Sequence, residues 1–409
     1  MMQTDLLIIG AGPGGYRAAE YAAHEGLQVV IVEQDEVGGT CLNRGCIPTK
    51  TYVHSASFAE AVERQQQVVA QLRSGVEAIL SQPNITLLRG HAEFVDANTV
   101  RVGEETIAAK NIIIATGSSA KMPPIDDIND PRVMTSTELL QLKEQPKRLC
   151  IIGAGVIGME FASVFNRFGS EVTVIEFLKE CLPALDSDIA KRLRKQLEKK
   201  GVTFKMKTAV ENVADLDADV ILMATGRKPR TAGLNLEAVG ITLTPQGAIP
   251  VDDNYQAVSN IYAIGDANGR QMLAHAAEMQ AIRAVNHILG KNDGIRFDIM
   301  PAAIFTEPEA ACVGPTEDQL KEQGIVYECK KSFWRANGKA LAMNETEGML
   351  KLFASPEGEI LGCHAFGAHA ADMVQEVSVL MCKHTTLHEL ADMVHIHPTL
   401  SEILKNAAE

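Results

Sequence analysis

The sequence of 409 residues contains no low-complexity segment and no apolar run of the roughly 20 residues that cross a bilayer. It also has no excess of positive charge, because 38 Lys and Arg stand against 52 Asp and Glu, a net charge of −14. Nucleic acids and anionic membranes require a net basic surface, so we expect neither as a partner. The residues Met1–Asp5 lack a basic stretch before the first apolar residues, so we expect no signal peptide.

Cysteine is scarce, with eight residues in the chain. Six of them lie singly, at positions 150, 181, 312, 329, 363 and 382, which is typical of reduced thiols and indicates a cytosolic protein. Only Cys41 and Cys46 lie close together. A Cys-x4-Cys spacing is uncommon for zinc, and no second Cys or His pair completes a site, so we expect no metal.

A repeat dominates what the sequence does contain. Residues 5–15 read DLLIIGAGPGG and residues 148–158 read RLCIIGAGVIG, and each is an apolar strand that runs into G-x-G-x-x-G and a helical pattern. A second strand then ends at Glu33 and at Glu176, and a later strand in each copy ends in Ala-Thr-Gly. The pattern is typical of βαβ units, so we predict an α/β protein with two doubly wound dinucleotide-binding domains.

The chain changes character near its C-terminus. Short strand patterns at 301–314, 328–332, 349–354 and 360–366 are followed by helical patterns from Ala370 and from Leu387. This order indicates a separate C-terminal α+β domain. We predict a first domain split between residues 1–120 and 245–297, a second domain at 121–244 and a third at 298–409.

The two glycine motifs favour nucleotide binding. Glycines let the backbone approach a pyrophosphate, and the helix N-terminus supplies N–H donors. Glu33 and Glu176 each stand 23 residues after the first glycine, where a carboxylate accepts from a ribose 2′-hydroxyl and repels a 2′-phosphate. Because Phe177 and Leu178 follow Glu176 and no Arg does, we favour NAD over NADP for the second copy. The alternative is a pair of tight turns in an α/β core.

The cysteine pair suits a reversible dithiol. As a structural link it would be poor, since so small a loop gains only ~2 kcal/mol in the chain-entropy model. Lys50 and a helix N-terminus near these residues would stabilise a thiolate. The alternative is two unreactive buried cysteines.

Two further sites stand out. In His395-Ile-His397-Pro-Thr-Leu-Ser-Glu402, the proline suits the first position of a helix, so we expect His397 at the helix cap. We expect Glu402 to orient the imidazole of His397, which would act as a general base. His395, one strand-step away, would point elsewhere and have a structural role. Asp266 ends an apolar strand, where ligands bind in open α/β sheets. The alternatives are that His397 and Asp266 only cap helices.

Together, these strings resemble the pyridine nucleotide–disulfide oxidoreductases. GGTCLNRGCIPTK is similar to the redox motif of that family, and HIHPTLSE to its C-terminal His–Glu motif. Five motifs in the expected order cover nearly the whole chain. The resemblance implies FAD on the first nucleotide-binding domain, NAD on the second, and a homodimer formed through the C-terminal dimerisation domain.

The resemblance also implies site residues. The catalytic residues would be Cys41, Cys46, Lys50, Glu160, His397 and Glu402. FAD would contact Gly10, Gly12, Gly14, Gly15, Glu33, Gly39, Thr40, Lys50, His91, Ala92, Thr116, Gly117, Ser118, Asp266, Met272, Leu273, Ala274 and His275. NAD would contact Gly153, Gly155, Ile157, Gly158, Glu176, Val210 and Gly226.

The implied reaction is the oxidation of protein-bound dihydrolipoamide to lipoamide, with electrons passing through a Cys41–Cys46 disulfide and FAD to NAD⁺. Cys41 would be the thiol that meets the substrate and Cys46 the thiolate against the flavin, with Lys50 beside flavin N5 and paired with Glu160. His397 would act from the other subunit. The implied partner is a lipoyl-bearing protein, from the acyltransferase core of a 2-oxoacid dehydrogenase complex or from the glycine cleavage system.

Three other functions compete with this one. A glutathione-reductase-like enzyme should carry basic residues near Glu176, and a mercuric-reductase-like enzyme should end in paired cysteines, but the sequence shows neither. A catalytically idle flavoprotein subunit would not need the cysteine pair and the His–Glu motif. The chain is shorter than the family pattern after Lys50 and again at 210–219, and we expect the second gap to alter the adenine side of the NAD-binding domain.

Overall fold

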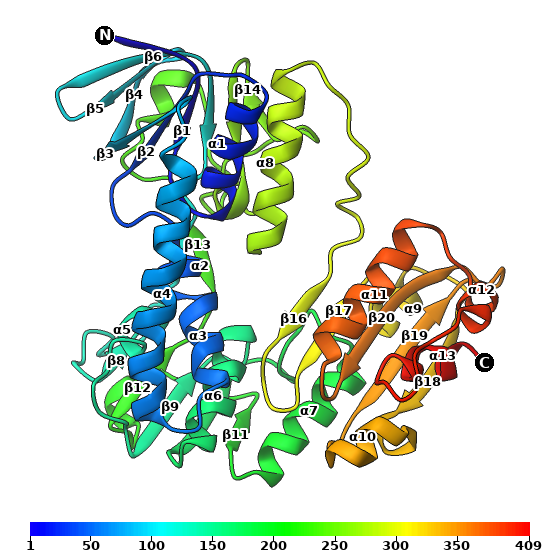
Figure 1. Ribbon diagram of the computed structural model, residues 1–409. Helices are drawn as coiled ribbons and strands as arrows, with labels where there is room; N and C mark the ends of the chain where they lie inside the picture. Colours follow the sequence, from blue (N-terminus) through cyan, green and yellow to red (C-terminus); the bar gives the residue numbers. More distant parts are fainter. The chain divides into compact units, whose positions relative to one another are not determined.

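The computed structural model describes all residues, Met1–Glu409, as two compact units. Unit 1 comprises Met1–Lys121, Ser136–Gln141 and Gly226–Ile295, and unit 2 comprises Met122–Thr135, Leu142–Thr225 and Arg296–Glu409. Each combines helices with a parallel sheet, which confirms the predicted α/β class (Figure 1). None of the helices is both long enough and apolar enough to cross a membrane.

Unit 1 is built on an eight-stranded sheet with the order β14-β15-β6-β1-β2-β3, to which β4 and β5 are added beside β6. Its central strand, β1, pairs in parallel with both β2 and β6, so the carboxyl ends of these strands meet at one edge of the sheet. The strands are β1 (Met2–Ile9), β2 (Val29–Glu33), β3 (Ile85–Arg89), β4 (Ala92–Asp96), β5 (Thr99–Val102), β6 (Glu105–Ile114), β14 (Gln256–Val258) and β15 (Ile261–Ala263).

The helices of unit 1 place the sequence motifs around that edge. They are α1 (Pro13–His24), α2 (Gly39–Arg44), α3 (Cys46–Val53), α4 (Phe58–Leu80), α5 (Ser136–Leu139) and α8 (Ala274–Ile288). Helices α1 and α8 lie side by side (Figure 1) and approach closely, since a Cβ at Gly14 would come within 3.2 Å of Ala277. Gly14 therefore serves helix packing, the role that the fold gives to a small residue at this point.

The boundary of unit 1 differs from the sequence prediction. Residues 226–244, which we assigned to the second domain, pack in unit 1. There β13 (Arg227–Pro229) pairs with β7 (Ser118–Ala120), and the Phe94 N–H donates to the Leu234 carbonyl. Leu234 and Leu236 join the same buried cluster as Phe94, which explains why this segment leaves the second domain. The rest of the three-domain division stays a prediction.

Unit 2 begins with a five-stranded parallel sheet in the order β11-β10-β9-β12-β8. Its elements are β8 (Val133–Met134), β9 (Arg148–Ile152), α6 (Val156–Arg167), β10 (Glu171–Glu176), α7 (Ser187–Lys199), β11 (Thr203–Met206) and β12 (Val220–Met223). The short connection at 210–219 contains only a 3-10 turn, Val213–Asp215. The Arg132 guanidinium holds this connection in place by donating to the carbonyls of Leu216 and Ala218.

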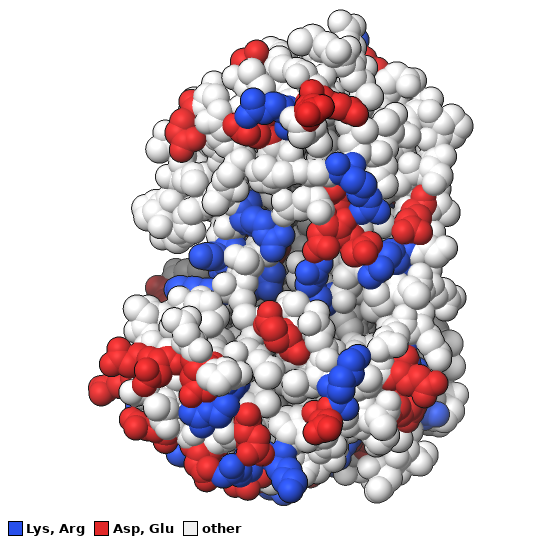
Figure 2. Space-filling model, turned by 90° about the vertical axis from the view of Figure 1, so that its left-hand side faces the viewer, with Lys and Arg blue, Asp and Glu red and all other residues white.

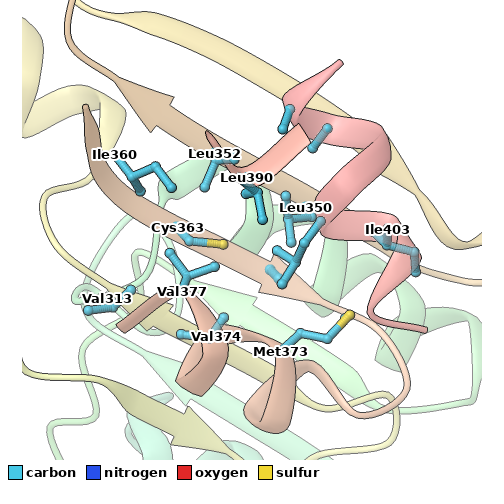
Figure 3. Packing of buried hydrophobic residues seen from close by; sticks show 14 of the residues in the cluster. Val313, Leu350, Leu352, Ile360, Cys363, Met373, Val374, Val377, Leu390 and Ile403 are labelled. Atoms are coloured by element: carbon cyan, nitrogen blue, oxygen red, sulfur yellow. The ribbon is translucent and has the colours of Figure 1, made fainter. Parts of the chain in front are cut away.

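The C-terminal part of unit 2 is an antiparallel sheet in the order β16-β17-β20-β19-β18, with helices against it. The strands are β16 (Ala302–Ile304), β17 (Ala310–Val313), β18 (Glu328–Phe333), β19 (Met349–Ala354) and β20 (Ile360–Phe366), and the helices are α9 (Glu317–Glu322), α10 (Gly338–Met343), α11 (Ala370–Cys382), α12 (Leu387–Asp392) and α13 (Glu402–Ala408). Side chains from β19, β20, α11 and α13 meet in one buried cluster (Figure 3). This core fixes α13, and with it Glu402.

A buried ion cluster ties the two parts of unit 2 together. The Lys351 ammonium in β19 is 1% exposed and lies 2.7 Å from Asp186 and 2.6 Å from Glu317. Asp186 caps α7, and its backbone N–H donates to His364 in β20. The hydrogen bond from Lys351 holds the pKa of Glu317 at about 2, well below its usual range.

The surface carries both signs of charge. On the face shown in Figure 2, Lys and Arg side chains are interspersed with Asp and Glu among uncharged residues. Exposed pairs of opposite charge on the molecule include Arg101 with Glu93 at 2.9 Å and Arg192 with Asp188 at 2.9 Å. Pairs of this kind contribute only about 0–1 kcal/mol each to stability.

Candidate active site

The first glycine turn forms a cradle of bare backbone between β1 and α1. A Cβ at Gly15 would lie 1.9 Å from the Gly10 carbonyl oxygen, and a Cβ at Gly39 would lie 2.6 Å from the Cα of Gly12, so neither position accepts a side chain. Gly12 is the N-cap of α1 and offers no side chain to its first N–H groups. This arrangement fits the pyrophosphate of FAD, which needs close backbone approach and the positive end of a helix.

Glu33 stands beside this cradle at the end of β2. Its carboxylate accepts from the Ala11 N–H at 2.7 Å and from the Asp35 N–H at 2.9 Å. The His91 ring, which the resemblance includes among the FAD contacts, is held nearby by Gln34 and by the Gly233 carbonyl. Its neighbour Ala92 is buried in β4.

The opposite side of the FAD site contains Asp266 and the start of α8. Asp266 lies in a 3-10 turn, Gly265–Asn268, and accepts a hydrogen bond from the Ser118 hydroxyl. The N-cap of α8 is Leu273, so the alternative that Asp266 caps this helix is wrong. The four residues Met272, Leu273, Ala274 and His275 lie at the N-terminal end of α8, where the helix dipole favours electron-rich ligand atoms.

The Ala-Thr-Gly turn after β6 completes this edge. The Thr116 hydroxyl donates to the Arg230 carbonyl, and the Arg230 N–H donates to the Gly117 carbonyl at 2.9 Å. Gly117 has a positive φ of 72°, and a Cβ there would meet open space. The turn thus leaves room for a ligand where a side chain would otherwise stand.

The two sulfurs of the C-x4-C motif come together where α2 meets α3. Cys41 lies in α2 beside Thr40, and Cys46 is the first residue of α3. A hydrogen bond with Cys46, together with burial, raises the pKa of the Cys41 thiol, while Lys50 acts in the opposite direction. Because Cys46 is exposed and stands at a helix N-terminus, the single negative charge of the pair is favoured on Cys46.

Sequence reasoning missed Arg227. It begins β13, and its guanidinium donates to both oxygens of Ser118, from Nε to the hydroxyl at 2.7 Å and from Nη2 to the carbonyl at 2.8 Å. The guanidinium also lies 3.9 Å from the Asp266 carboxylate, in a site where the Arg227 side chain is only 19% exposed. The repeat in the sequence could have indicated this contact, because Ser118 and Arg227 each directly follow an Ala-Thr-Gly string.

The second glycine turn repeats the first in unit 2. A Cβ at Gly158 would lie 2.0 Å from the Gly153 carbonyl oxygen, and Gly155 caps α6 without a side-chain contact, with Ile157 in the first turn. The Glu176 carboxylate accepts from the Ala154 N–H at 2.6 Å and from the Leu178 N–H at 2.7 Å. The same bare cradle and carboxylate therefore fit NAD.

The resemblance implies two further NAD contacts, from Val210 and Gly226. Val210 packs against the core of the parallel sheet of unit 2. Gly226 lies in unit 1, so its NAD contact stays a prediction. The same holds for the ion pair of Lys50 with Glu160, because the two residues belong to different units. Glu160 is buried in α6, where its carboxylate accepts from the Phe305 N–H at 2.9 Å.

The His–Glu motif forms a direct pair. His397 Nδ1 lies 2.9 Å from Glu402 Oε1, and the imidazole is 78% exposed. The predicted helix start at Pro398 is wrong, since α13 begins at Glu402. The Glu402 carboxylate, in the first turn of α13, accepts from the Thr399 N–H at 2.9 Å as well as contacting the imidazole, which holds the preceding residues in a turn outside the helix. His395 is held by Glu376 and the Met393 carbonyl, as a structural role requires.

Comparison with known proteins decides the family. Residues 4–281 match the family model described as pyridine nucleotide-disulphide oxidoreductase, and residues 300–408 match the dimerisation domain of the same family. The chain belongs to the pyridine nucleotide–disulfide oxidoreductases. The two matches cover both glycine turns, the thiol pair and the His–Glu pair.

Similar members of the family cover almost the whole chain. The mitochondrial dihydrolipoyl dehydrogenase of Pisum sativum is 37% identical over 99% of this chain and 91% of its own length. The dihydrolipoyl dehydrogenase of Geobacillus stearothermophilus is 38% identical over 100% of this chain and 96% of its own. Among solved structures, the HOCl-induced flavoprotein disulfide reductase from Escherichia coli is 34% identical, with a TM-score of 0.93 over 99% of both chains.

Membership of this family confirms the predicted chemical class. The protein is a flavoprotein disulfide oxidoreductase with FAD and NAD as cofactors. Its C-terminal region, residues 300–408, is the dimerisation domain of the pyridine nucleotide–disulfide oxidoreductases. The bare cradles at Gly12 and Gly155 agree with two nucleotide cofactors.

Proposed function

We propose that this protein is a dihydrolipoyl dehydrogenase, which oxidises a protein-bound dihydrolipoyl group and reduces NAD⁺. The observation that carries the proposal is the pair of hydrogen-bonded thiols, Cys41 and Cys46, in the unit that holds the first glycine cradle. The names of the relatives at 37% and 38% identity support the same activity.

The thiol pair takes two electrons from the substrate. In the oxidised enzyme Cys41 and Cys46 form a disulfide, and a substrate thiolate attacks the Cys41 sulfur and releases Cys46 as a thiolate. The second substrate thiol then attacks the first substrate sulfur, which closes the lipoyl disulfide and releases Cys41. Of the two substrate protons, one stays on Cys41 and one leaves. FAD, which the cradle at Gly10, Gly12 and Gly15 would hold, would supply the redox chemistry that links the thiol pair to the reduction of NAD⁺ to NADH.

His397 is proposed to take the proton of the attacking substrate thiol. Glu402 holds Nδ1, which leaves Nε2 for the substrate. The Thr399 N–H and the His397 ring lower the pKa of Glu402, so it stays a carboxylate and fixes the ring. Val394 and Ile396, beside the histidine, are 99% and 78% exposed, which supports a homodimer contact here. In that homodimer the histidine serves the thiols of the other subunit.

Charge and exposure support the remaining parts of the proposal. The Glu176 carboxylate stands where a ribose 2′-hydroxyl is bound in this fold, which favours NAD over NADP. The buried thiols Cys150, Cys181 and Cys363 support a cytosolic location. The proposed partner is a lipoyl-bearing protein of a 2-oxoacid dehydrogenase complex or of the glycine cleavage system.

The experiment is a steady-state assay of NADH formation from dihydrolipoamide and NAD⁺. We expect Cys41→Ser and Cys46→Ser to abolish turnover and His397→Gln to lower kcat/KM by about 10²–10⁴-fold, the usual range for loss of a general base. Cys382→Ser, at another exposed cysteine, is the matched control and should be fully active. Absence of NADH formation by flavin-loaded wild-type enzyme would contradict the proposal.

A second candidate is an NADH-dependent reductase of another disulfide. It is favoured by the structural likeness to the Escherichia coli disulfide reductase, which has a TM-score of 0.93 over 99% of both chains. The assay separates the two candidates. An enzyme that oxidises NADH with small or protein disulfides, but forms no NADH from dihydrolipoamide, would be this reductase.

A further inference from the structure

The segment between the two cysteines is held from outside by an arginine of α4. The Arg73 guanidinium donates to the side-chain oxygen of Asn43 from Nε, at 3.0 Å, and from Nη2, at 2.8 Å. Asn43 lies in α2, between Cys41 and Cys46 in the sequence. The Arg73 side chain is 31% exposed, so this forked contact is partly shielded from water. Arg73 therefore holds the loop that a Cys41–Cys46 disulfide would close.

The Asn43 amide connects Arg73 to the backbone that precedes Cys41. Its nitrogen donates to the carbonyls of Val37 and Gly39, each at 2.9 Å. Both the donors and the oxygen of the amide are thus used, and the opposite orientation would place the NH2 group against the guanidinium. The amide therefore has one orientation, which ties the loop to α4 on one side and to residues 37–39 on the other.

The other end of the loop is held from α3. The Gly45 carbonyl accepts from the Thr49 hydroxyl at 2.7 Å and from the Thr49 N–H at 3.1 Å. Gly45 also packs against the start of the loop, because a Cβ there would lie 2.9 Å from the Thr40 carbonyl oxygen and 3.3 Å from the Cys41 Cα. The backbone just before Cys46 is thus in contact with the backbone of Cys41, which favours a disulfide between them.

The freedom of the loop determines how readily the two thiols form a disulfide. A loop that moves freely in the dithiol state loses that freedom when the disulfide closes, and this entropy cost makes the disulfide easier to reduce. A loop that is already held in the dithiol state loses less. Cys41 and Cys46 are both free thiols in this structure, and the contacts of Asn43 are present in this state.

We propose that Arg73 is a positioning residue of the redox site, which acts through Asn43 to hold the thiols together and so stabilises the disulfide relative to the dithiol. The step concerned is the reduction of the Cys41–Cys46 disulfide by an external dithiol, which gives up two electrons and two protons and becomes a disulfide itself. The inference deepens the proposed function, because it rests on the same thiol pair, but it does not depend on which dithiol is the substrate.

The experiment measures the midpoint potential of the thiol pair in the flavin-loaded enzyme. Mixtures of reduced and oxidised dithiothreitol, rather than a lipoyl compound, set the potential under anaerobic conditions. Each sample is quenched in acid and its free thiols are alkylated. Mass spectrometry of the peptide that contains Cys41 and Cys46 then gives the fraction of disulfide at each potential. A change that only destabilises the fold leaves this midpoint unchanged.

The variants separate Arg73 from its partner. Arg73→Met and Asn43→Ala each remove the forked contact, and a double variant combines them. Arg73→Lys keeps the charge but cannot form the fork. Arg64→Met is the matched control, because Arg64 also lies on α4 and also donates to a backbone carbonyl, that of His54, which lies outside the cysteine loop.

We expect the equilibrium constant for disulfide formation to fall about tenfold in Arg73→Met, which raises the midpoint potential by about 30 mV. Asn43→Ala should raise the potential at least as far. Adding Arg73→Met to Asn43→Ala should have no further effect, since Arg73 acts through Asn43. Arg73→Lys should lie between Arg73→Met and the wild type, and Arg64→Met should match the wild type.

The opposite results are equally distinct. A potential in Arg73→Met that equals that of Arg64→Met, or is more negative, would overturn the role of Arg73, and so would a further rise in the double variant. If Arg73→Met does not retain flavin, the comparison of Arg73→Lys with Arg64→Met decides in the same way. A wild type in which Cys41 and Cys46 form no disulfide would contradict the proposed function, and the inference with it. The expected shifts in an enzyme inactive toward dihydrolipoamide would contradict only the substrate.

Discussion

Cys46 stands at the first position of α3, whereas Cys41 lies within the shorter helix α2. This difference in helix position, added to the hydrogen bond between the sulfurs, gives the two thiols different chemistry. We predict that Cys46→Ser removes the long-wavelength band of the reduced enzyme, while Cys41→Ser keeps a band from the remaining thiolate. Absorbance spectra of both variants test this, and a band that persists in Cys46→Ser would mean that the thiol roles are exchanged.

Glu402 makes its contribution through the His397 ring and the Thr399 N–H. Both contacts lower the pKa of Glu402, so this carboxylate is ionised throughout the mildly acidic to neutral range. We predict that Glu402→Gln lowers kcat/KM for dihydrolipoamide by about 10–10²-fold, by the same factor across that range, because positioning of a general base is weakened rather than lost. Glu409→Gln, at the exposed end of α13, serves as the control. An unchanged kcat/KM in Glu402→Gln would show that the pair has only a structural role.

For single residues, the sequence predicted the site correctly where the type of residue determines its chemical role. The pairing of Cys41 with Cys46 and of His397 with Glu402 could be predicted because the partners are at most five residues apart. The helix start at Pro398 could not, because the turn that precedes α13 depends on the contacts of Glu402 with His397 and with the Thr399 N–H. Arg227 was also beyond reach, since its contacts with Ser118 span 109 residues of sequence.

At the scale of elements, the glycine turns were predicted in full because they depend on local sterics. We predict that Gly158→Ala, whose Cβ would lie 2.0 Å from the Gly153 carbonyl oxygen, destabilises the second cradle and weakens NADH binding at least tenfold. FAD content should be unchanged, because the first cradle lies in the other unit. Titration of NADH by fluorescence tests this, with Gly169→Ala as a weak control for loop glycines. Wild-type NADH affinity in Gly158→Ala would contradict the fit.

The buried cluster of Lys351, Asp186 and Glu317 could not be predicted, because its members lie in three different elements. We predict that Lys351→Met costs about 3–5 kcal/mol in the free energy of unfolding, since it leaves buried carboxylates without their cation. Urea denaturation measures this cost. Lys331→Met, at the exposed neighbouring position on β18, is the control and should be near neutral. A similar midpoint for both variants would contradict the role of the cluster.

The same cluster gives a pH dependence with a definite sign. The pKa of Glu317 is lowered from 4.5 to about 2, chiefly by the hydrogen bond from Lys351, so its contribution to stability is present above 4.5 and is lost as the pH falls toward 2. We expect acid unfolding of the wild type in that window and a weaker pH dependence there in Lys351→Met. Circular dichroism as a function of pH tests this, and identical acid transitions in the two proteins would contradict it.

For the whole molecule, the repeat in the sequence was sufficient to predict two nucleotide-binding domains and their chemical class. The sequence did not predict the domain boundary near residue 245 correctly, because the apolar pattern of Leu234 and Leu236 fits either domain. Only their packing against Phe94 decides to which domain they belong. The predicted ion pair of Lys50 with Glu160 and the proposed homodimer contact around Ile396 likewise depend on assembled parts and not on local sequence, and both stay predictions.

In the proposed reaction, two electrons pass from a dihydrolipoyl group through Cys41 and Cys46 to the flavin and on to NAD⁺. The most direct measurement is an absorbance spectrum of the flavin-loaded enzyme during anaerobic titration, first with dihydrolipoamide and then with NAD⁺. We expect one equivalent of dihydrolipoamide to produce the long-wavelength thiolate band, and NAD⁺ then to remove it as NADH appears. An oxidised flavin spectrum that dihydrolipoamide leaves unchanged would contradict the account.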